Sequence, residues 1–227
     1  MIEKNFLRVI GDAHGCINVQ HPKKAISYLD LIKDAPYSVQ LGDMGFNYSG
    51  LRGVDPDCHI FIQGNHENYD DIPIHALTTY GMQSLGSWSF FYVRGAWSID
   101  VKQRLRAMRS GMTPKIWWEE EELNREQMDK CYEEYVQTEP DVVITHSCPS
   151  SIADKIGSPG AWKYFGWDAP KVSNTQLLLQ EMYDVWQPNL WIFGHMHREW
   201  FYTDKYTDFI CIDELSYLDF NKDWEIL

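Results

Sequence analysis

Five short apolar runs, each closed by a cluster of Gly, Asp, Asn or His residues, constrain the fold of this chain more than any other feature. The runs are rich in β-branched and aromatic residues, which is typical of buried strands. Because the runs are continuous rather than alternating, the pattern favours a sheet that is covered on both faces. The runs span residues 6–10, 39–41, 60–62, 142–144 and 190–193.

Helical patterns separate these runs. Residues 22–33 and 174–186 carry apolar side chains at helical spacing. A strand, a helix and a strand in succession predict a right-handed parallel crossover, and hence an α/β fold. The polar clusters then gather at the carboxyl ends of strands, where open α/β sheets bind their ligands. Residues 88–93, 200–202 and 209–212 predict further strands.

A single domain is expected over residues 1–227, because no linker composition interrupts the sequence. Residues 100–136 depart from the strand–helix rhythm. They are dense in charge, with Arg104, Arg106 and Arg109 followed by the Trp117-Trp118 pair and an acidic run, and they predict an insertion of helix and loop.

Charge and cysteine content restrict the partners and the compartment. The formal net charge of -13 would repel a polyanion, so we expect no nucleic-acid partner unless bound divalent ions supply a local cationic site. Five scattered cysteines without a CxxC pair predict free thiols in a reducing environment. The apolar stretch at the N-terminus is too short for a signal peptide and no membrane span is evident, so we expect a cytoplasmic protein.

The polar clusters together offer oxygen and imidazole donors without a thiolate, a set that suits Mn²⁺, iron or Zn²⁺. Seven donors are too many for one ion that keeps a position open for water, but they serve two ions if a carboxylate bridges, and Asp43 is the candidate bridge. Two ions about 3.5 to 4 Å apart can share a hydroxide and hold both oxygens of an in-line displacement, which indicates hydrolysis of a phosphate ester. The donors are Asp12, His14, Asp43, Asn65, His146, His195 and His197.

The spacing within two motifs supports a shared cavity. In Asp12-x-His14 and in His195-x-His197, residues i and i+2 of an extended segment point the same way, so we expect each strand end to deliver two donors to one cavity. A single histidine is more often a core or surface residue than a ligand. The three histidines outside the motifs, His21, His59 and His75, are therefore interpreted as ordinary residues.

The ordered motifs resemble those of the calcineurin-like metallophosphoesterase superfamily, from about residue 8 to about residue 200. The resemblance rests on DAH (12–14), GD (42–43), GNHE (64–67), TH (145–146) and GHMH (194–197). It implies a four-layer αββα sandwich of two mixed β-sheets flanked by helices, with the metals at the strand ends.

The resemblance also implies residue roles. His66 would lie beside the leaving group as a general acid or as a residue that orients the phosphate, and Glu67 would support it from behind, so His66 and Asp43 are the expected catalytic residues. The ligands would divide so that Asp12, His14 and His197 hold the first ion, Asn65, His146 and His195 hold the second, and Asp43 bridges the two.

One motif departs from a branch of the superfamily. Protein serine/threonine phosphatases carry GDxxDRG, but Phe46 and Asn47 stand here where that Asp-Arg pair would be. Another group must then bind the phosphate, and Arg gives the best bidentate geometry. The stretch from Arg94 through Arg104 to Trp117-Trp118 resembles an insertion of some bacterial and phage members, so we expect Arg94 or Arg104 to reach the substrate.

The resulting prediction is a binuclear metal-dependent phosphoesterase that hydrolyses a phosphate mono- or diester of a small molecule or nucleotide by attack of a metal-bridging hydroxide. The alternatives are a Ser/Thr-type protein phosphatase of the small phage or bacterial kind, a nuclease, and a non-catalytic scaffold with a phosphoesterase fold. The scaffold would be expected to lack metal ligands or the histidine at position 66, and this chain carries all of them.

Overall fold

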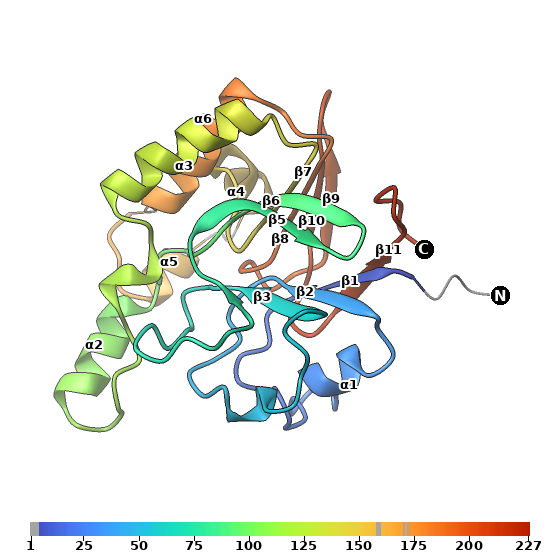
Figure 1. The fold of residues 1–227 in the computed structure, drawn as a ribbon. Helices are drawn as coiled ribbons and strands as arrows, with labels where there is room; N and C mark the ends of the chain where they lie inside the picture. Colours follow the sequence, from blue (N-terminus) through green and yellow to red (C-terminus); the bar gives the residue numbers. More distant parts are fainter. Residues whose placement is uncertain (1–4, 158–159, 170, 172) are drawn as a thin grey trace.

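Two β-sheets pack face to face, with helices on their outer sides (Figure 1). The computed structural model describes residues 5–157, 160–169, 171 and 173–227. One sheet has the strand order β11-β1-β2-β3-β4 and the other β5-β6-β7-β8-β10-β9. Each contains both parallel and antiparallel pairs, so both are mixed. The four-layer αββα sandwich expected from the sequence is therefore confirmed.

The strands are short, as the five apolar runs predict. The first sheet contains β1 (Leu7–Ile10), β2 (Tyr37–Gln40), β3 (His59–Ile62), β4 (Ala76–Leu77) and β11 (Tyr217–Phe220). The second contains β5 (Tyr80–Leu85), β6 (Trp88–Val93), β7 (Val142–Thr145), β8 (Leu190–Phe193), β9 (Trp200–Thr203) and β10 (Asp208–Cys211).

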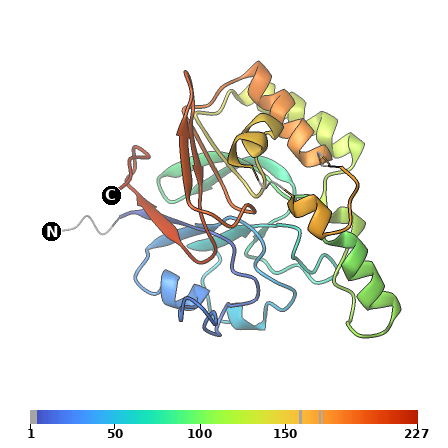
Figure 2. The same cartoon turned by 180° about the vertical axis from the view of Figure 1, so that it is seen from behind.

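The helices form the two outer layers, as the view from behind also shows (Figure 2). They are α1 (Tyr28–Ile32), α2 (Val101–Arg109), α3 (Arg125–Thr138), α4 (Ser150–Ile156), α5 (Ala161–Tyr164) and α6 (Asn174–Val185), with 3₁₀ turns at Ser49–Leu51 and Glu119–Glu121. None of the helices in the described ranges is both long and apolar enough to cross a membrane.

Successive residues of a strand pack into different hydrophobic cores, because their side chains alternate between the two faces of the sheet. Leu7 and Val9 of β1 point into the core between the sheets, whereas Ile10 packs with α1. On β6, Trp88 and Phe90 face the inter-sheet core, and Phe91 packs under α3 and α6. Both faces of the central strands are buried, which explains their continuous apolar runs.

The first predicted helix is much shorter than residues 22–33. α1 begins after Ser27, whose side chain accepts a hydrogen bond from the Asp30 backbone while the Asp30 carboxylate accepts one from the Ser27 backbone, forming a capping box. Upstream of this cap, Ala25 has φ +53°, a left-handed conformation that ends any helix. The helix predicted over residues 174–186 is confirmed as α6, which ends at Val185.

Parallel pairing brings the carboxyl ends of the central strands to one edge of the sandwich. β1, β2 and β3 run parallel, with Val9 opposite Val39 and Val39 opposite Ile60. In the other sheet β7 and β8 are parallel, with Ile144 opposite Ile192. The loops after all five strands therefore meet in one region, which contains the site described next.

Candidate metal centre

A glycine precedes four of the seven candidate ligands, and the structure shows why side chains are excluded there. A β-carbon at Gly64 would lie 2.2 Å from Asp43 Oδ1. One at Gly194 would lie 2.4 Å from Asp12 Oδ1, and one at Gly42 would lie 2.4 Å from His146 Nδ1. Real β-carbons do not approach other atoms so closely, so only glycine allows the strand ends of the two sheets to come together.

The backbone of several ligands is left-handed, which contradicts the extended segments expected from the i, i+2 spacing. His14, Asp43, His195 and His197 have φ of +45°, +56°, +64° and +47°. Such a conformation costs a non-glycine residue about 1 to 2 kcal/mol. Cross-links between the loops hold it, because the Asp43 carbonyl accepts from His14 N and the Asp12 carboxylate accepts from His195 N. Strain of this kind concentrates at functional sites.

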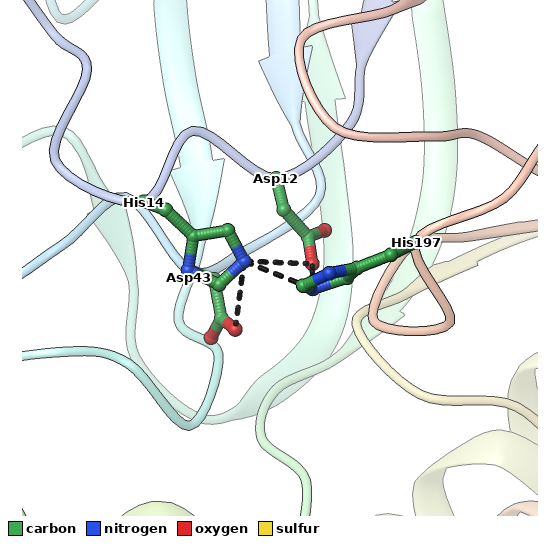
Figure 3. Close-up of side chains that lie close together, drawn as sticks. All are labelled: Asp12, His14, Asp43 and His197. Atoms are coloured by element: carbon green, nitrogen blue, oxygen red, sulfur yellow. Dashed lines mark hydrogen bonds and ion pairs between the residues drawn. The ribbon is translucent and has the colours of Figure 1, made fainter. Parts of the chain in front are cut away.

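The first donor cluster consists of Asp12, His14, Asp43 and His197 (Figure 3). One ligand atom from each lies within 4.8 Å of the others. His14 Nε2 lies 2.9 Å from His197 Nε2, and Asp12 Oδ2 lies 3.7 Å from the first nitrogen and 3.2 Å from the second. Two imidazole nitrogens and a carboxylate oxygen thus face one point.

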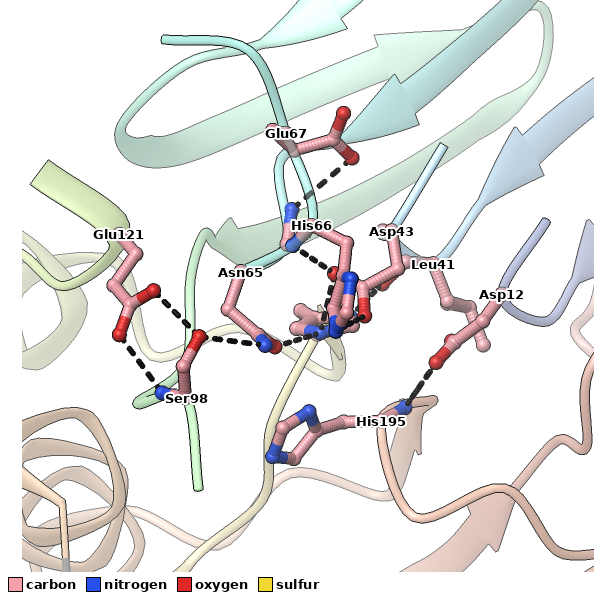
Figure 4. Close-up of polar contacts among 12 residues, drawn as sticks. Asp12, Leu41, Asp43, Asn65, His66, Glu67, Ser98, Glu121 and His195 are labelled. Carbon is pink, nitrogen blue, oxygen red and sulfur yellow. Dashed lines mark hydrogen bonds and ion pairs between the residues drawn. The ribbon is translucent and has the colours of Figure 1, made fainter. Parts of the chain in front are cut away.

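The second donor cluster consists of Asp43, Asn65, His146 and His195. Ligand atoms of Asp43, His146 and His195 lie within 4.8 Å of one another. Asn65 Oδ1 is 3.1 Å from His146 Nε2, so the amide oxygen faces the same space (Figure 4). Both clusters draw on both sheets, and all seven residues predicted as ligands are brought together.

Asp43 belongs to both clusters and is only 1% exposed. Its Oδ1 lies 3.2 Å from His146 Nε2 in the second cluster, whereas its Oδ2 lies 3.9 Å from His14 Nε2 in the first. Burial opposes ionisation of this carboxyl group, but the neighbouring imidazoles of His146 and His66 hold its pKa well below the ordinary value. A deprotonated carboxylate with one oxygen toward each cluster is the geometry that a bridging ligand requires.

Hydrogen bonds behind the ligands orient them. His146 Nδ1 lies 2.8 Å from the Leu41 carbonyl, to which it can only donate, so Nε2 is the ring nitrogen that is directed toward Asp43 and is available to a metal ion. Asn65 Nδ2 donates to Ser98 Oγ at 3.1 Å, which turns the amide oxygen toward the cluster. Ser98 Oγ in turn donates to Glu121 Oε2 at 2.6 Å (Figure 4).

His66 lies beside the shared Asp43, with its Nε2 4.0 Å from Asp43 Oδ2 and its ring centre 4.8 Å from that of His14 in the first cluster. Arg104 Nη2 contacts the same Nε2, and its other nitrogens bond to the Asn65 carbonyl at 2.9 Å and to Asp100 Oδ2 at 2.9 Å. Burial lowers the pKa of His66 to about 4, and the Arg104 guanidinium acts in the same direction. Arg104 is only 4% exposed, and its bonds to the Asn65 carbonyl and to Asp100 hold it beside His66.

Arg94 and Glu67 bond to groups other than those expected from the sequence. Arg94 is 4% exposed, and it donates to Tyr69 Oη at 3.2 Å and to the Glu120 carbonyl rather than facing the donor clusters. Glu67 does not bond to the His66 ring. Its carboxylate accepts from Met44 N and from Tyr48 Oη, each at 2.7 Å, and so ties the loops after β2 and β3 together.

The structure adds residues that the sequence analysis missed. Glu214 Oε1 lies 3.5 Å from both His14 Nε2 and His197 Nδ1, so a third carboxylate adjoins the first cluster. Glu214 follows β10, beyond the stretch that carries the motifs. Ser98 lies just before the charged insertion, and Glu121 lies within it. No local sequence pattern in this region distinguishes a residue that orients a ligand from an ordinary polar residue.

Comparison with known proteins supports the fold. Neither a protein-family model nor a curated protein sequence matches this chain. Among solved structures it is similar to a dimetal phosphatase from Danio rerio, with a TM-score of 0.53, 13% identity, and coverage of 94% of this chain and 91% of that one. A phosphopantetheinyl hydrolase from Mycobacterium tuberculosis matches with a TM-score of 0.47 and 12% identity over 92% of this chain and 89% of the other. The chain thus has the calcineurin-like metallophosphoesterase fold that its motifs resemble.

The donor set fits divalent ions. It joins carboxylate and amide oxygens with imidazole nitrogens, and its carboxylates supply negative charge next to histidines that are oriented to present lone pairs. Borderline and hard ions such as Mn²⁺, iron and Zn²⁺ prefer such ligands. No cysteine among the described residues belongs to either cluster. The arrangement therefore offers two clusters of donors suited to divalent ions, and the two clusters share Asp43.

Gly194→Ala should weaken binding at the first cluster, because the new β-carbon would displace Asp12 Oδ1. We expect Mn²⁺ affinity to fall by about 10- to 100-fold, as for lost orienting contacts, when measured by titration calorimetry. Gln137→Ala is the control, since Gln137 is an exposed residue of α3 and belongs to neither cluster. Equal affinity for the wild type and Gly194→Ala would contradict the packing argument.

Burial raises the pKa of Glu121 from 4.5 to about 7. A raised pKa in the folded state means that the stability contributed by the protonated carboxyl group is present below pH 4.5 and is lost as pH rises to about 7. In urea denaturation from pH 4.5 to 8, the free energy of unfolding should fall more for the wild type than for Glu121→Gln. Glu119 is exposed, so Glu119→Gln should show the same pH dependence as the wild type. If the free energy of unfolding changed equally with pH in all three proteins, Glu121 would not be the source of the pH dependence.

Proposed function

We propose that this chain is a metal-dependent hydrolase that cleaves phosphate mono- or diesters with two divalent ions. The observation that carries the proposal is the pair of donor clusters that share Asp43 at the strand ends. In this assignment Asp12, His14 and His197 hold one ion, Asn65, His146 and His195 hold the other, and Asp43 bridges. The ions are Mn²⁺, iron or Zn²⁺, and the substrate is the phosphoester of a small molecule or nucleotide.

The bound ions would lower the pKa of a water molecule between them and neutralise charge on the phosphoryl oxygens. The chain's own residues make this possible in three ways. The carboxylates of Asp12 and Asp43 balance the positive charge. The Leu41 carbonyl and Ser98 keep the ligand atoms of His146 and Asn65 aimed at the centre. Burial of Asp12 and Asp43 at 1% exposure excludes bulk water, which strengthens these interactions.

The contact with Arg104 favours one of the two roles expected for His66. A guanidinium can only donate, so the His66 Nε2 that Arg104 contacts is an acceptor without a proton. Because this contact leaves Nε2 no proton for the leaving oxygen, we assign His66 the phosphate-orienting role, in which Nδ1–H would be the donor of the ring, and Arg104 positions His66. In this proposal Arg104 acts through His66 and the Asn65 carbonyl, and Arg94 supports the loops.

The alternatives draw no support from the neighbourhood of His66. At the position where the protein phosphatases carry the Asp of their Asp-Arg pair, the Phe46 ring lies 6.0 Å from the His66 ring and 5.9 Å from Trp118. An aromatic contact replaces the carboxylate partner that the protein-phosphatase alternative requires. The intact donor clusters oppose a non-catalytic scaffold.

The wild type should bind two Mn²⁺ ions per chain and hydrolyse 4-nitrophenyl phosphate or its bis-ester. Asp43→Asn should weaken both sites because the bridge loses its charge, whereas His14→Ala should lose one site. Metal analysis after dialysis, paired with turnover, measures both quantities. His59→Gln is the control, since His59 bonds to Ser38 and belongs to neither cluster. A wild type that binds no ions, or that binds two without turnover, would refute the proposal.

If His66 orients phosphate, His66→Gln should reduce kcat by a similar factor for phenyl phosphate and for 4-nitrophenyl phosphate. A general acid matters more for the poorer leaving group, and its loss would slow phenyl phosphate hydrolysis by a further 10²- to 10⁴-fold or so. Steady-state kinetics on both esters gives the ratio. Arg104→Ala should produce the same pattern with a smaller loss, and a selective loss with phenyl phosphate would restore the acid role.

A further inference from the structure

A cavity of about 460 Å³ opens directly beside the second donor cluster. Asp43, Asn65, His66 and His195 form its inner wall. This volume lies in the range of sites that enclose one small molecule, about 300 to 1,000 Å³. Any phosphoester that places its phosphorus at the donor clusters can extend its organic part into this space.

The outer wall is aromatic. Trp97 comes from the segment after β6, whereas Trp162 and Phe165 come from α5 and the turn that follows it. Ile99 and Met196 complete the apolar lining. All five side chains are partly exposed and line the cavity, so part of their apolar surface faces it. Flat aromatic surfaces of this kind favour a planar ring as occupant.

Contacts between the two outer segments hold this wall in place. Trp167 Nε1 donates to the Ile99 carbonyl at 2.7 Å, and the Trp167 ring packs edge-on against Trp97 at 5.0 Å. Lys102 Nζ donates to the Gly166 carbonyl at 2.7 Å and lies 3.9 Å from the centre of the Trp167 ring. The α5 segment is therefore attached to the segment that carries Trp97, and the cavity is pre-formed.

The charges of the lining restrict the occupant further. Asp100 and Asp154 contribute carboxylates, and Lys171 is the only lysine or arginine among the described lining residues. Its ammonium group already lies 4.6 Å from the centre of the Trp97 ring. A second phosphate in the organic part would meet the Asp154 carboxylate and the Asp100 carboxylate, the latter paired with Arg104, so a neutral or weakly basic ring fits better than an anionic group.

We infer that this cavity binds the alcohol part of the substrate as a planar aromatic group, either a nucleobase or an aryl ring, of at most nucleoside size. The inference rests on the proposed function, whose substrate class it narrows. The aliphatic side chain of a phosphoserine would leave these aromatic surfaces without a partner, which is a further argument against the protein-phosphatase alternative.

Matched substrate pairs test the inference. Adenosine 5′-monophosphate and ribose 5-phosphate share the leaving oxygen and differ in the base, and benzyl phosphate and propyl phosphate differ in the aryl ring. Base–aromatic stacking predicts that kcat/KM for the aromatic member is higher by at least about tenfold. The first pair reports a nucleobase site and the second an aryl site. If only diesters are cleaved, the methyl diesters of the same alcohols replace the monoesters.

Trp162→Leu should reduce the ratio within the responding pair toward one. Tyr206→Leu is the control, because Tyr206 is 57% exposed and does not line the cavity. Trp97→Leu provides a second test from the other segment. Ratios near one for both pairs in the wild type, or an unchanged ratio in both tryptophan variants, would overturn the inference.

Binding separates this inference from the proposed function. Adenosine and benzyl alcohol should quench the tryptophan fluorescence of the purified protein, with weaker binding in Trp162→Leu. If no phosphoester is hydrolysed but one of these alcohols binds in a Trp162-dependent way, the proposed function fails and the aromatic site stands. If phosphoesters are hydrolysed but neither alcohol binds, the aromatic site fails and the hydrolase stands.

Discussion

The close approach of two sets of strand ends around the Asp43 carboxylate is the constraint on which the remainder of the site depends. One oxygen of Asp43 faces His146 from the second sheet, and the other faces His14 from the first. This approach is possible only because Gly42, Gly64 and Gly194 leave room where any β-carbon would collide. The motifs GD, GNHE and GHMH are therefore packing requirements as much as sets of donors.

Formation of the site costs free energy of folding, and the packing of the surrounding sandwich offsets this cost. Four ligand residues have left-handed backbones, and two carboxylates are buried at 1% exposure. Fixed hydrogen bonds from backbone and side chains offset part of this cost, and the apolar cores on both faces of the central strands stabilise the fold that carries the loops. A preformed arrangement of this kind needs little reorganisation when a ligand binds, which is the condition for electrostatic catalysis.

Much of the fold could be predicted because buried parallel strands leave a strong signal in sequence. The five central strands and α6 follow from apolar runs and helical spacing. The edge strands β4, β5 and β11 were missed, since edge strands are half exposed and short and their pattern is weak. The helix predicted over residues 22–33 was too long because apolar spacing continues through Ala25, whose left-handed conformation depends on loop contacts. The extended geometry expected for Asp12-x-His14 and His195-x-His197 was wrong for the same reason.

The sequence by itself determined which residue types stand at the strand ends, and hence the seven donors, the glycines beside them and the class of chemistry that they suit. Only the tertiary structure decided that Arg104 contacts His66 while Arg94 supports loops, that Glu214 adjoins the first cluster, and that aromatic side chains from Trp97 and α5 enclose one cavity. The physical reason is range: strand patterns and turn residues act between neighbours along the chain, whereas these contacts join segments from separate sheets and loops that meet only when the sandwich closes.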